Sequence, residues 1–374
     1  MSVLFTDGRN ATAPLGHEGF GNNSAIAAST YLPQSSQLHL LTTRGDDILV
    51  DLPGPIELAP LDGRPTIYLD QNHWSTLTNT IHQPDRVTNE EELEAATHLI
   101  ELATRRRVVL PMSSAHMSET CKQVDIEERY KRALTVTQLS AGWQLADPLA
   151  IRRFELRQAL TGRYHQRWLA LPPAVTLEPD AVHANREKSL QAIDSDLPEQ
   201  ARWAVHAIRC IGGNLDTMLD TEHIPMGPVP GWAAQFQRFA AFLAANPTGP
   251  EMKRQRTHAK FIVDLGRELA EEAHRAGITP EQMSDWALHH SDDDLRHMPA
   301  LGLFREVLHE KLCNGRLRWE QNDLIDMMFL TAAGGYCDHV VGERAHTSHL
   351  RNALRRLGRA TNVHHNIRTL VKHL

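Results

Sequence analysis

Hydrophobic and polar residues follow a strand-then-helix pattern in the first third of the chain. The segment TIYLDQNHWSTL (66–77) begins as a short apolar run, which stops at Asp70 and gives way to a helical pattern. RVVLPM (107–112) predicts a second buried strand. Between them, 89–104 predicts a helix, because Asn89 suits its N-cap and acidic residues fill its first turn. The pattern therefore indicates a strand–helix–strand unit.

The segments on either side of this unit have patterns of their own. Residues 1–35 are rich in Gly, Asn, Ala, Ser and Thr, which predicts a loosely held leader. QLHLLTTRGDDILVDL (37–52) predicts a β-hairpin of two short strands around a turn at 44–47. After the second buried strand, 113–139 predicts one long helix.

The central part of the chain has few strand signals, and Pro- and Gly-rich connectors separate its helical segments. Strands that alternate with helices return near the C-terminus. Alternation of this kind predicts a parallel sheet with helices on both faces. The expected C-terminal elements are a helix at 322–333, a strand at 337–343, a helix at 345–357, a strand at 360–365 and a short helix at 367–374.

The fold class that follows is α/β, with a parallel sheet flanked by helices and interrupted by a large all-helical insertion. The expected boundaries are 1–60 for the leader and hairpin, 61–137 for the first part of the α/β domain, 138–319 for the insertion and 320–374 for the second part.

Composition narrows the class of protein. The 374 residues are 41% hydrophobic and 23% charged, which is typical of a folded soluble protein. A net charge of −7 argues against wholesale wrapping of nucleic acid, but it leaves room for a local basic groove. The four cysteines form no CxxC pair, so a reducing, cytoplasmic location fits. No apolar run approaches the length of about 20 residues that spans a bilayer, so we expect no membrane partner.

Acidic residues mark the ends of the predicted strands. Asp70 follows the first strand, and Glu343 closes the strand at 337–343. Glu119 falls in the first turns of the helix after the second strand. Ligands of open parallel sheets bind beyond the carboxyl ends of the strands. These positions predict that several carboxylates meet at one edge of the sheet.

The helix at 322–333 carries two more acids. Asp323 and Asp326 are three residues apart and share a face, yet the helix is apolar nearly all round, as buried helices are. A buried carboxylate is costly unless it is paired or bound to a cation. Asp338, beside the following strand, is either a further ligand or only a strand-end residue. An oxygen-rich setting of this kind suits Mg²⁺ or Mn²⁺.

With these elements in this order, the chain resembles the PIN-like domain nucleases. The resemblance implies a PIN-like fold and a metal-dependent endoribonuclease that cleaves RNA phosphodiester bonds, either toxin-like or a defence effector. The motifs that carry it are YLDQNHWS, SSAHMSET, NDLIDMMFLTAA, CDHVVGE and the terminal ATNVHHNIRTLVKHL.

The resemblance also implies roles for individual residues. One or two Mg²⁺ or Mn²⁺ ions would orient and activate a water and neutralise the phosphate. The implied ligands are Asp70, Glu119, Asp323 or Asp326, and Glu343, and Asn72 is a candidate to contact the substrate. His346 either faces phosphate or is a surface residue. Arg163 and Tyr164 belong to a basic, aromatic stretch at 152–170 that suits an RNA backbone with stacked bases.

Simpler explanations remain open for each signal. Asp70 with Asn72 also suits a turn and a capped helix, and Asp323 suits a first helical turn. HHSDDDLRH (289–297) has the composition of a metal cluster, but a helix capped by Ser291 with three acids in its first turn is the favoured interpretation. The basic, aromatic stretch also suits an amphipathic helix with a solvated face.

Two other functions stay open. The first is a catalytically inactive PIN-like scaffold that binds RNA or protein. The second is a phosphatase of the haloacid dehalogenase type, which needs Asp-x-Asp after the first strand, where this chain has Asn72. RNA is the expected partner, together with a protein inhibitor or regulatory partner. The RNA target and the oligomeric state are not predicted.

Overall fold

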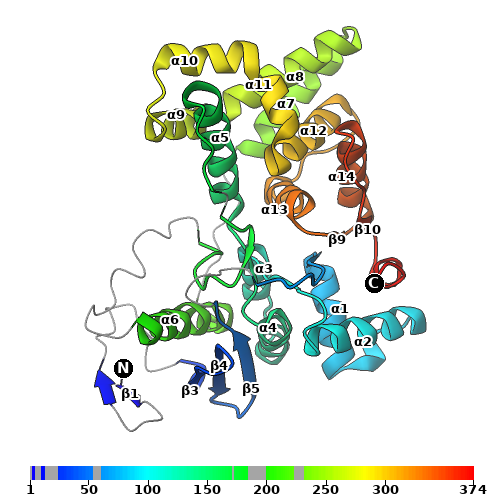
Figure 1. The fold of residues 1–374 in the computed structure, drawn as a ribbon. Coiled ribbons are helices and arrows are strands. Elements are labelled where there is room, and N and C mark those ends of the chain that lie inside the picture. The colour runs from blue at the N-terminus through cyan, green and yellow to red at the C-terminus, as the bar shows by residue number, and fades with distance from the viewer. Residues whose placement is uncertain are drawn as a thin grey trace. The chain divides into compact units, whose positions relative to one another are not determined.

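The computed structural model describes residues 2–4, 10–12, 24–53, 60–170, 172–183, 199–222 and 231–374. The chain divides into two compact units. Unit 1 comprises Met1–Asp147, Val175–Met226 and Val371–Leu374, and unit 2 comprises Pro148–Ala174 and Gly227–Leu370. Both units contain helices and short strands, so the fold is mixed α/β (Figure 1).

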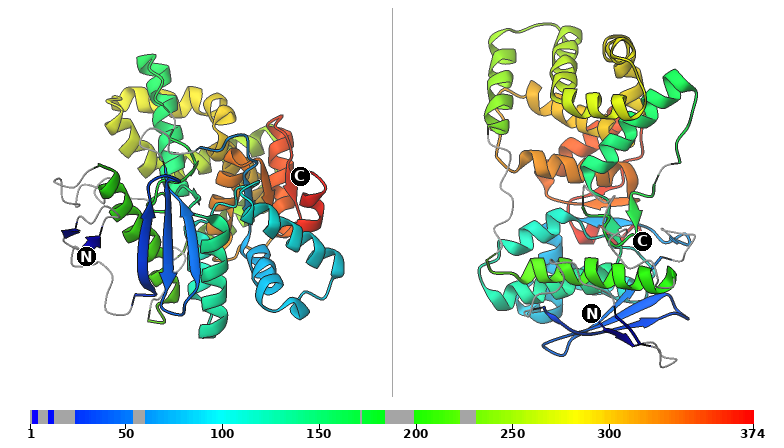
Figure 2. Two further views of the ribbon diagram at one scale, coloured as in Figure 1. Left: turned by 60° about the horizontal axis from the view of Figure 1, so that its bottom comes forward. Right: turned by 90° about the vertical axis from the view of Figure 1, so that its left-hand side faces the viewer.

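An antiparallel meander of three strands occupies the N-terminal part of unit 1 (Figure 2). Its strands are β3 (Ile26–Leu32), β4 (Gln37–Thr42) and β5 (Asp47–Asp51), and α6 (Glu199–Leu219) packs against β3. Alternate side chains of β4 and β5 are buried, as expected for a sheet with one face on the core. A separate short pair, β1 (Ser2–Leu4) and β2 (Asn10–Thr12), is also antiparallel.

The predicted hairpin at 37–52 is confirmed by the pairing of β4 with β5. The loosely held leader is wrong for residues 26–32, because β3 pairs with β4 along its length. The polar composition of that segment agrees with its position, since most β3 side chains are exposed.

A buried strand and two helices follow in unit 1. They are β6 (Ile67–Leu69), α1 (Gln71–His82) and α2 (Glu90–Thr104), with a 3₁₀ turn at Pro84–Arg86 between the helices. The Asn89 side chain caps α2 by accepting the backbone N–H of Glu92 at 2.9 Å, as the sequence predicts. Ile67 N donates to Val109 O at 2.8 Å beside a parallel bridge between Thr66 and Val109. The parallel pairing of the first two predicted strands is therefore confirmed, although the second consists only of isolated bridges.

Two helices replace the single long helix expected at 113–139. They are α3 (Ser114–Cys121) and α4 (Ile126–Ser140). Asp125 caps α4 by accepting the backbone N–H of Glu128 at 3.0 Å, so a new helix starts where an uninterrupted one was predicted. Further along, β7 (Gln144–Leu145) pairs antiparallel with β8 (Val175–Thr176).

Unit 2 is built around α12 (Pro299–Cys313), which is buried along most of its length. The other helices before it in this unit are α5 (Pro148–His165), α7 (Trp232–Ala245), α8 (Pro250–Asp264), α9 (Gly266–Arg275), α10 (Pro280–Asp285), a π-helical turn at Trp286–His290 and α11 (Ser291–His297). Within the described part of 138–319, every regular element except β7 and β8 is therefore a helix.

Strands and helices alternate in the C-terminal part of unit 2, as the sequence predicts. The elements are α13 (Asp323–Tyr336), β9 (His339–Val341), α14 (Arg344–Arg356), β10 (Val363–His364) and α15 (Ile367–Val371). The two strands are parallel, with Val363 beside Val340 and His364 beside Val341.

The boundaries of the compact units differ from the predicted domain boundaries. Residues 320–370 belong to the same unit as the helices of 227–319, because α13 and α14 both pack on α12. The assembly of 61–137 and 320–374 into one PIN-like domain stays a prediction. Among the described residues, no helix has the length and apolar character needed to cross a bilayer.

Candidate functional site

Asp70 lies directly after the first buried strand of unit 1. All three residues of β6 are buried, and Asp70 caps α1, with its Oδ1 accepting the backbone N–H of Gln71 at 2.8 Å. The Asp70 side chain is half-buried, whereas Asn72, in the first turn of α1, is exposed. This is the edge at which parallel-sheet proteins bind ligands, and the helix cap gives Asp70 a structural role there as well.

His116 joins the start of α3 to the end of β6. Its Nδ1 accepts the backbone N–H of Ser113 at 3.1 Å, so Nε2 carries the proton and donates to the Leu69 carbonyl at 2.8 Å. The ring centroid lies 5.1 Å from that of Tyr68 and 5.7 Å from that of Trp74. Burial lowers the pKa of His116 to about 4, so the imidazole is neutral at pH 7. His116 is not among the predicted site residues, and the only local signal for it is Ser113 at the N-cap of α3, with which it forms a capping box.

Glu119 is a surface residue of α3. It forms an ion pair with Lys122 three positions later, and its side chain is 41% exposed. Exposed pairs of this kind contribute little to stability. Within unit 1, Glu119 therefore has a lysine partner, and its predicted role as a metal ligand gains no support from its contacts.

Asp323 has a lysine partner inside the core of unit 2. Lys311 Nζ lies 2.5 Å from Asp323 Oδ1, and the backbone N–H of Glu320 donates to Oδ2 at 2.7 Å. Both side chains of the pair are almost fully buried. The expectation that the apolar helix holds a buried carboxylate with a cation is therefore met by an ammonium group. The contacts of Asp323 in the core give no support to a role as metal ligand, which stays a prediction.

Asp326 lies one turn further along α13 and reaches the first turn of α14. His346 Nε2 is 3.7 Å from Asp326 Oδ2, and the Asp326 side chain is 39% exposed. Glu343, exposed, is the N-cap residue of the same helix α14 and follows β9 after a single glycine. Three of the predicted residues, Asp326, Glu343 and His346, therefore lie at the carboxyl end of β9.

Asp338 lies at the other end of that strand. It precedes β9, whereas Glu343 follows it, so the two carboxylates flank the strand and do not share an edge. Asp338 instead lines a cavity of about 780 Å³ within unit 2. The two carboxylates lie at opposite ends of β9, which favours Asp338 as a strand-end residue, and Asp338 as a metal ligand stays a prediction.

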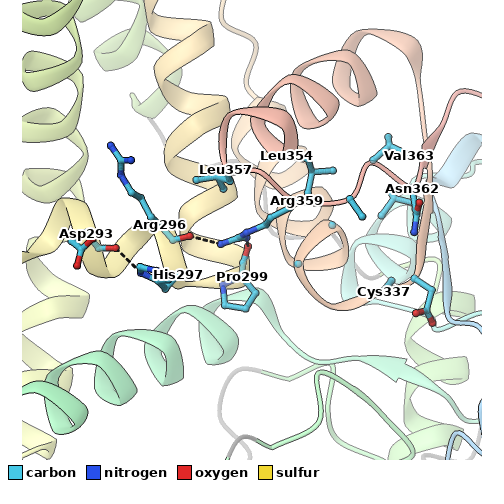
Figure 3. Close-up of a pocket in the computed structure, with 15 residues that line it drawn as sticks. Asp293, Arg296, His297, Pro299, Cys337, Leu354, Leu357, Arg359, Asn362 and Val363 are labelled. Atoms are coloured by element: carbon cyan, nitrogen blue, oxygen red, sulfur yellow. Dashed lines mark hydrogen bonds between the residues drawn. The ribbon is translucent and has the colours of Figure 1, made fainter.

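The cavity wall is held by Arg359, which the sequence analysis did not single out. The Arg359 guanidinium donates to the carbonyl oxygens of Arg296 and Pro299 at 2.7 and 2.8 Å (Figure 3). It also donates to the Met298 carbonyl at 2.9 Å. A Cβ on Gly335 would lie 2.7 Å from the Pro299 carbonyl carbon, so only glycine allows this approach of α13 to α12. The arginine therefore ties the start of α12 to the loop after α14.

The polar groups of Arg163 and Tyr164 make contacts inside unit 2. Arg163 forms a two-pronged ion pair with Asp294, with N–O distances of 3.0 and 2.5 Å. Tyr164 donates to Asp285 at 2.8 Å, and burial together with this bond raises the pKa of Tyr164 to about 12. These contacts favour a structural role, since α5 uses both side chains to hold α10 and α11, and a role in RNA binding stays a prediction.

The segment 289–297 forms a helix with three acids in its first turn, as favoured over a metal cluster. Ser291 is not its cap, because the helical turn before it continues into α11 and the Ser291 hydroxyl donates to Ala287 O. Within the described residues, no group of three or more His, Cys, Asp or Glu side chains is arranged to hold a metal ion.

Comparison of the chain with protein-family models, with curated proteins and with solved structures gives no match. The likeness to PIN-like nucleases therefore depends on the sequence motifs alone, and the function that follows is a proposal.

Proposed function

We propose that the protein is a metal-dependent endoribonuclease that cleaves RNA phosphodiester bonds. The observation that carries the proposal is the arrangement at the carboxyl end of β9, where the first turns of α13 and α14 bring Asp326 to His346 and Glu343 follows the strand. In unit 1, Asp70 has the same relation to its own strand, because it follows β6 directly. Acids at this end of parallel strands are the pattern expected of an α/β ligand site.

The donor atoms of this edge suit Mg²⁺ or Mn²⁺. Hard divalent cations prefer carboxylate oxygens, and Mg²⁺ is commonly held by one or two carboxylates while water and substrate phosphate complete its shell. Asp326 and Glu343 are both accessible from solvent, unlike Asp323. When bound, such an ion lowers the pKa of a water and neutralises charge on the phosphate.

The residues of the chain then have separable roles. Asp326 and Glu343 bind the ion. His346 lies beside Asp326, where an imidazole N–H can donate a hydrogen bond to a phosphate oxygen. The buried ion pair of Asp323 and Lys311 holds the start of α13 against α12 and takes no part in the reaction.

Two readouts test the proposal. Mn²⁺ should raise the melting temperature of the wild type, and the purified protein should cleave a labelled single-stranded RNA in Mn²⁺ but not in EDTA. Asp326→Asn and Glu343→Gln should lose both effects, with cleavage reduced about a hundredfold or more. Asp293→Asn is the matched control, because Asp293 is an exposed acid in the first turn of α11 of the same unit.

Each outcome decides between the proposal and the inactive scaffold. Cleavage that persists in EDTA, or that is equal in wild type and both variants, would contradict the proposal. RNA binding by the wild type without cleavage in Mn²⁺ would favour the inactive scaffold.

A further inference from the structure

A chain of hydrogen bonds connects the start of α14 to the end of β10. The Thr347 hydroxyl donates to the Glu343 carbonyl at 2.8 Å, so its one hydrogen is used. The 2.8 Å contact between Thr347 Oγ1 and His365 Nδ1 must then have the ring nitrogen as donor. This sets the tautomer of His365, with its proton on Nδ1 and a lone pair on Nε2.

The lone pair of His365 orients Arg351. Arg351 Nη1 lies 3.2 Å from His365 Nε2 and donates to it, and Nη2 donates to the Val363 carbonyl at 2.9 Å. Burial, together with the charges of Arg351 and Arg344, lowers the pKa of His365, so the imidazole stays neutral and keeps its acceptor. These bonds use two of the five donors of the guanidinium and leave the others available.

Arg344, the first residue of α14, is also near His365. It is exposed, and its charge is close enough to His365 to disfavour protonation of the imidazole. In the described part of the chain, neither Arg344 nor Arg351 forms an ion pair with a carboxylate. Elsewhere on the same helix Arg356 pairs with Glu306 and Glu310. Among the residues that the structure describes, no carboxylate therefore forms an ion pair that compensates the charge of these two arginines.

We infer that Arg344 and Arg351 form a binding site for the phosphodiester backbone of single-stranded RNA, with His365 as a positioning residue that aims Arg351. Arginine recognises phosphate with paired N–H donors, and a guanidinium that is already oriented loses less freedom on binding. The inference deepens the proposed function and rests on it for the choice of RNA, since Glu343 at the start of the same helix is one of the proposed ion ligands.

The inference is tested by binding measured without cleavage. The anisotropy of a labelled RNA of about 12 nucleotides, a length within the range of single-strand binding sites, is followed in EDTA. Arg344→Gln and Arg351→Gln should each weaken binding about tenfold and reduce the slope of log affinity against log salt by about 0.7, since each removes one phosphate contact. Arg355→Gln is the matched control, because Arg355 is an exposed arginine near the opposite end of α14.

The role of His365 has its own test. His365→Ala should weaken binding while leaving the salt slope unchanged, because no charge is removed. His365→Gln should restore binding, since the amide supplies both a donor for Thr347 and an acceptor for Arg351. Failure of the glutamine to restore binding, at a melting temperature equal to that of wild type, would overturn the positioning role.

Three results would overturn the site itself. The first is RNA affinity equal to that of wild type in both arginine variants. The second is a loss of affinity in Arg355→Gln as large as that in Arg344→Gln and Arg351→Gln. The third is displacement of the RNA by inorganic phosphate at a concentration equal to that of the phosphates in the RNA. A protein that binds RNA through these arginines but never cleaves it would contradict the proposed nuclease and leave the binding site standing. Full cleavage activity in both arginine variants would contradict the binding site and leave the proposed nuclease standing.

Discussion

Lys311 Nζ lies 2.5 Å from Asp323 Oδ1, and the two side chains join α12 to α13 in the core of unit 2. The ammonium group also lies 5.0 Å from the centre of the Trp319 ring. The pair occupies the position where the sequence motif of α13 would place a metal ligand. Asp323 therefore fixes the start of α13, and Asp326 one turn later is the acid that reaches the accessible edge.

A double-mutant cycle tests this relationship. Asp323→Leu leaves the Lys311 charge buried without its partner, so it should lower the free energy of unfolding by about 3 to 5 kcal/mol. The double variant Lys311→Met/Asp323→Leu should recover most of that loss, because a buried ion pair can be replaced by apolar side chains at little cost. Urea unfolding measures both. Equal destabilisation by the single and double variants would contradict the pairing.

Asp326→Leu should behave differently. The apolar pattern of α13 suggested that Asp326 is a buried charge whose removal would stabilise the protein, but its side chain is 39% exposed. Removing it should therefore change the unfolding free energy by no more than about 0.5 kcal/mol. The Mn²⁺-induced rise in melting temperature should disappear at the same time. A stable variant that keeps this rise would exclude Asp326 as a ligand.

The stability of unit 1 should depend on pH through His116. Its folded pKa of about 4 lies below the value near 6.5 of an unfolded histidine, so the unfolded chain binds more protons between these values. This contribution to stability is present above pH 6.5 and is lost as the pH falls to 4, by about 3 kcal/mol.

Urea unfolding at several pH values checks this prediction. His116→Gln should reduce the dependence between pH 6.5 and 4 relative to wild type. The comparison removes the effect of His258 and His309, whose pKa values burial also lowers to about 4 and which both proteins share. Identical pH profiles for the two proteins would contradict a buried neutral His116.

Arg163→Gln should lower stability without changing RNA affinity. Its guanidinium is bonded to Asp294, so substitution breaks a partly buried pair between α5 and α11. Anisotropy with the same RNA in EDTA, together with the melting temperature, checks both parts. A loss of RNA affinity as large as that of Arg351→Gln would restore the substrate-binding role that the basic composition of 152–170 suggested.

The sequence predicts local features of this protein better than tertiary ones. The Asn89 cap, the hairpin at 37–52 and the order of elements from α13 to α15 depend on residues close together in the chain. The partner of Asp323 is different in kind. Lys311 is twelve residues away on another helix, and nothing in the pattern of either helix identifies the pair.

Partners far away in the sequence also explain the contacts that were not predicted at the candidate site. Arg163 and Tyr164 form a basic, aromatic pattern, but Asp294 and Asp285, more than a hundred residues away, determine what these side chains contact. Asp338 and Glu343 are close in sequence, yet the strand between them separates the two carboxylates. His116 differs from these residues, because its capping box with Ser113 is local and was still not predicted.

We propose that Asp326 binds the metal ion on which cleavage of RNA depends. We would measure the single-turnover cleavage rate of one labelled RNA by wild type, Asp326→Asn and Glu343→Gln, in Mn²⁺ and in EDTA. We predict no cleavage in EDTA, a loss of about a hundredfold or more in each variant at low Mn²⁺, partial rescue at high Mn²⁺ and unchanged RNA affinity. Equal rates for wild type and Asp326→Asn, or wild-type cleavage that persists in EDTA, would contradict the claim.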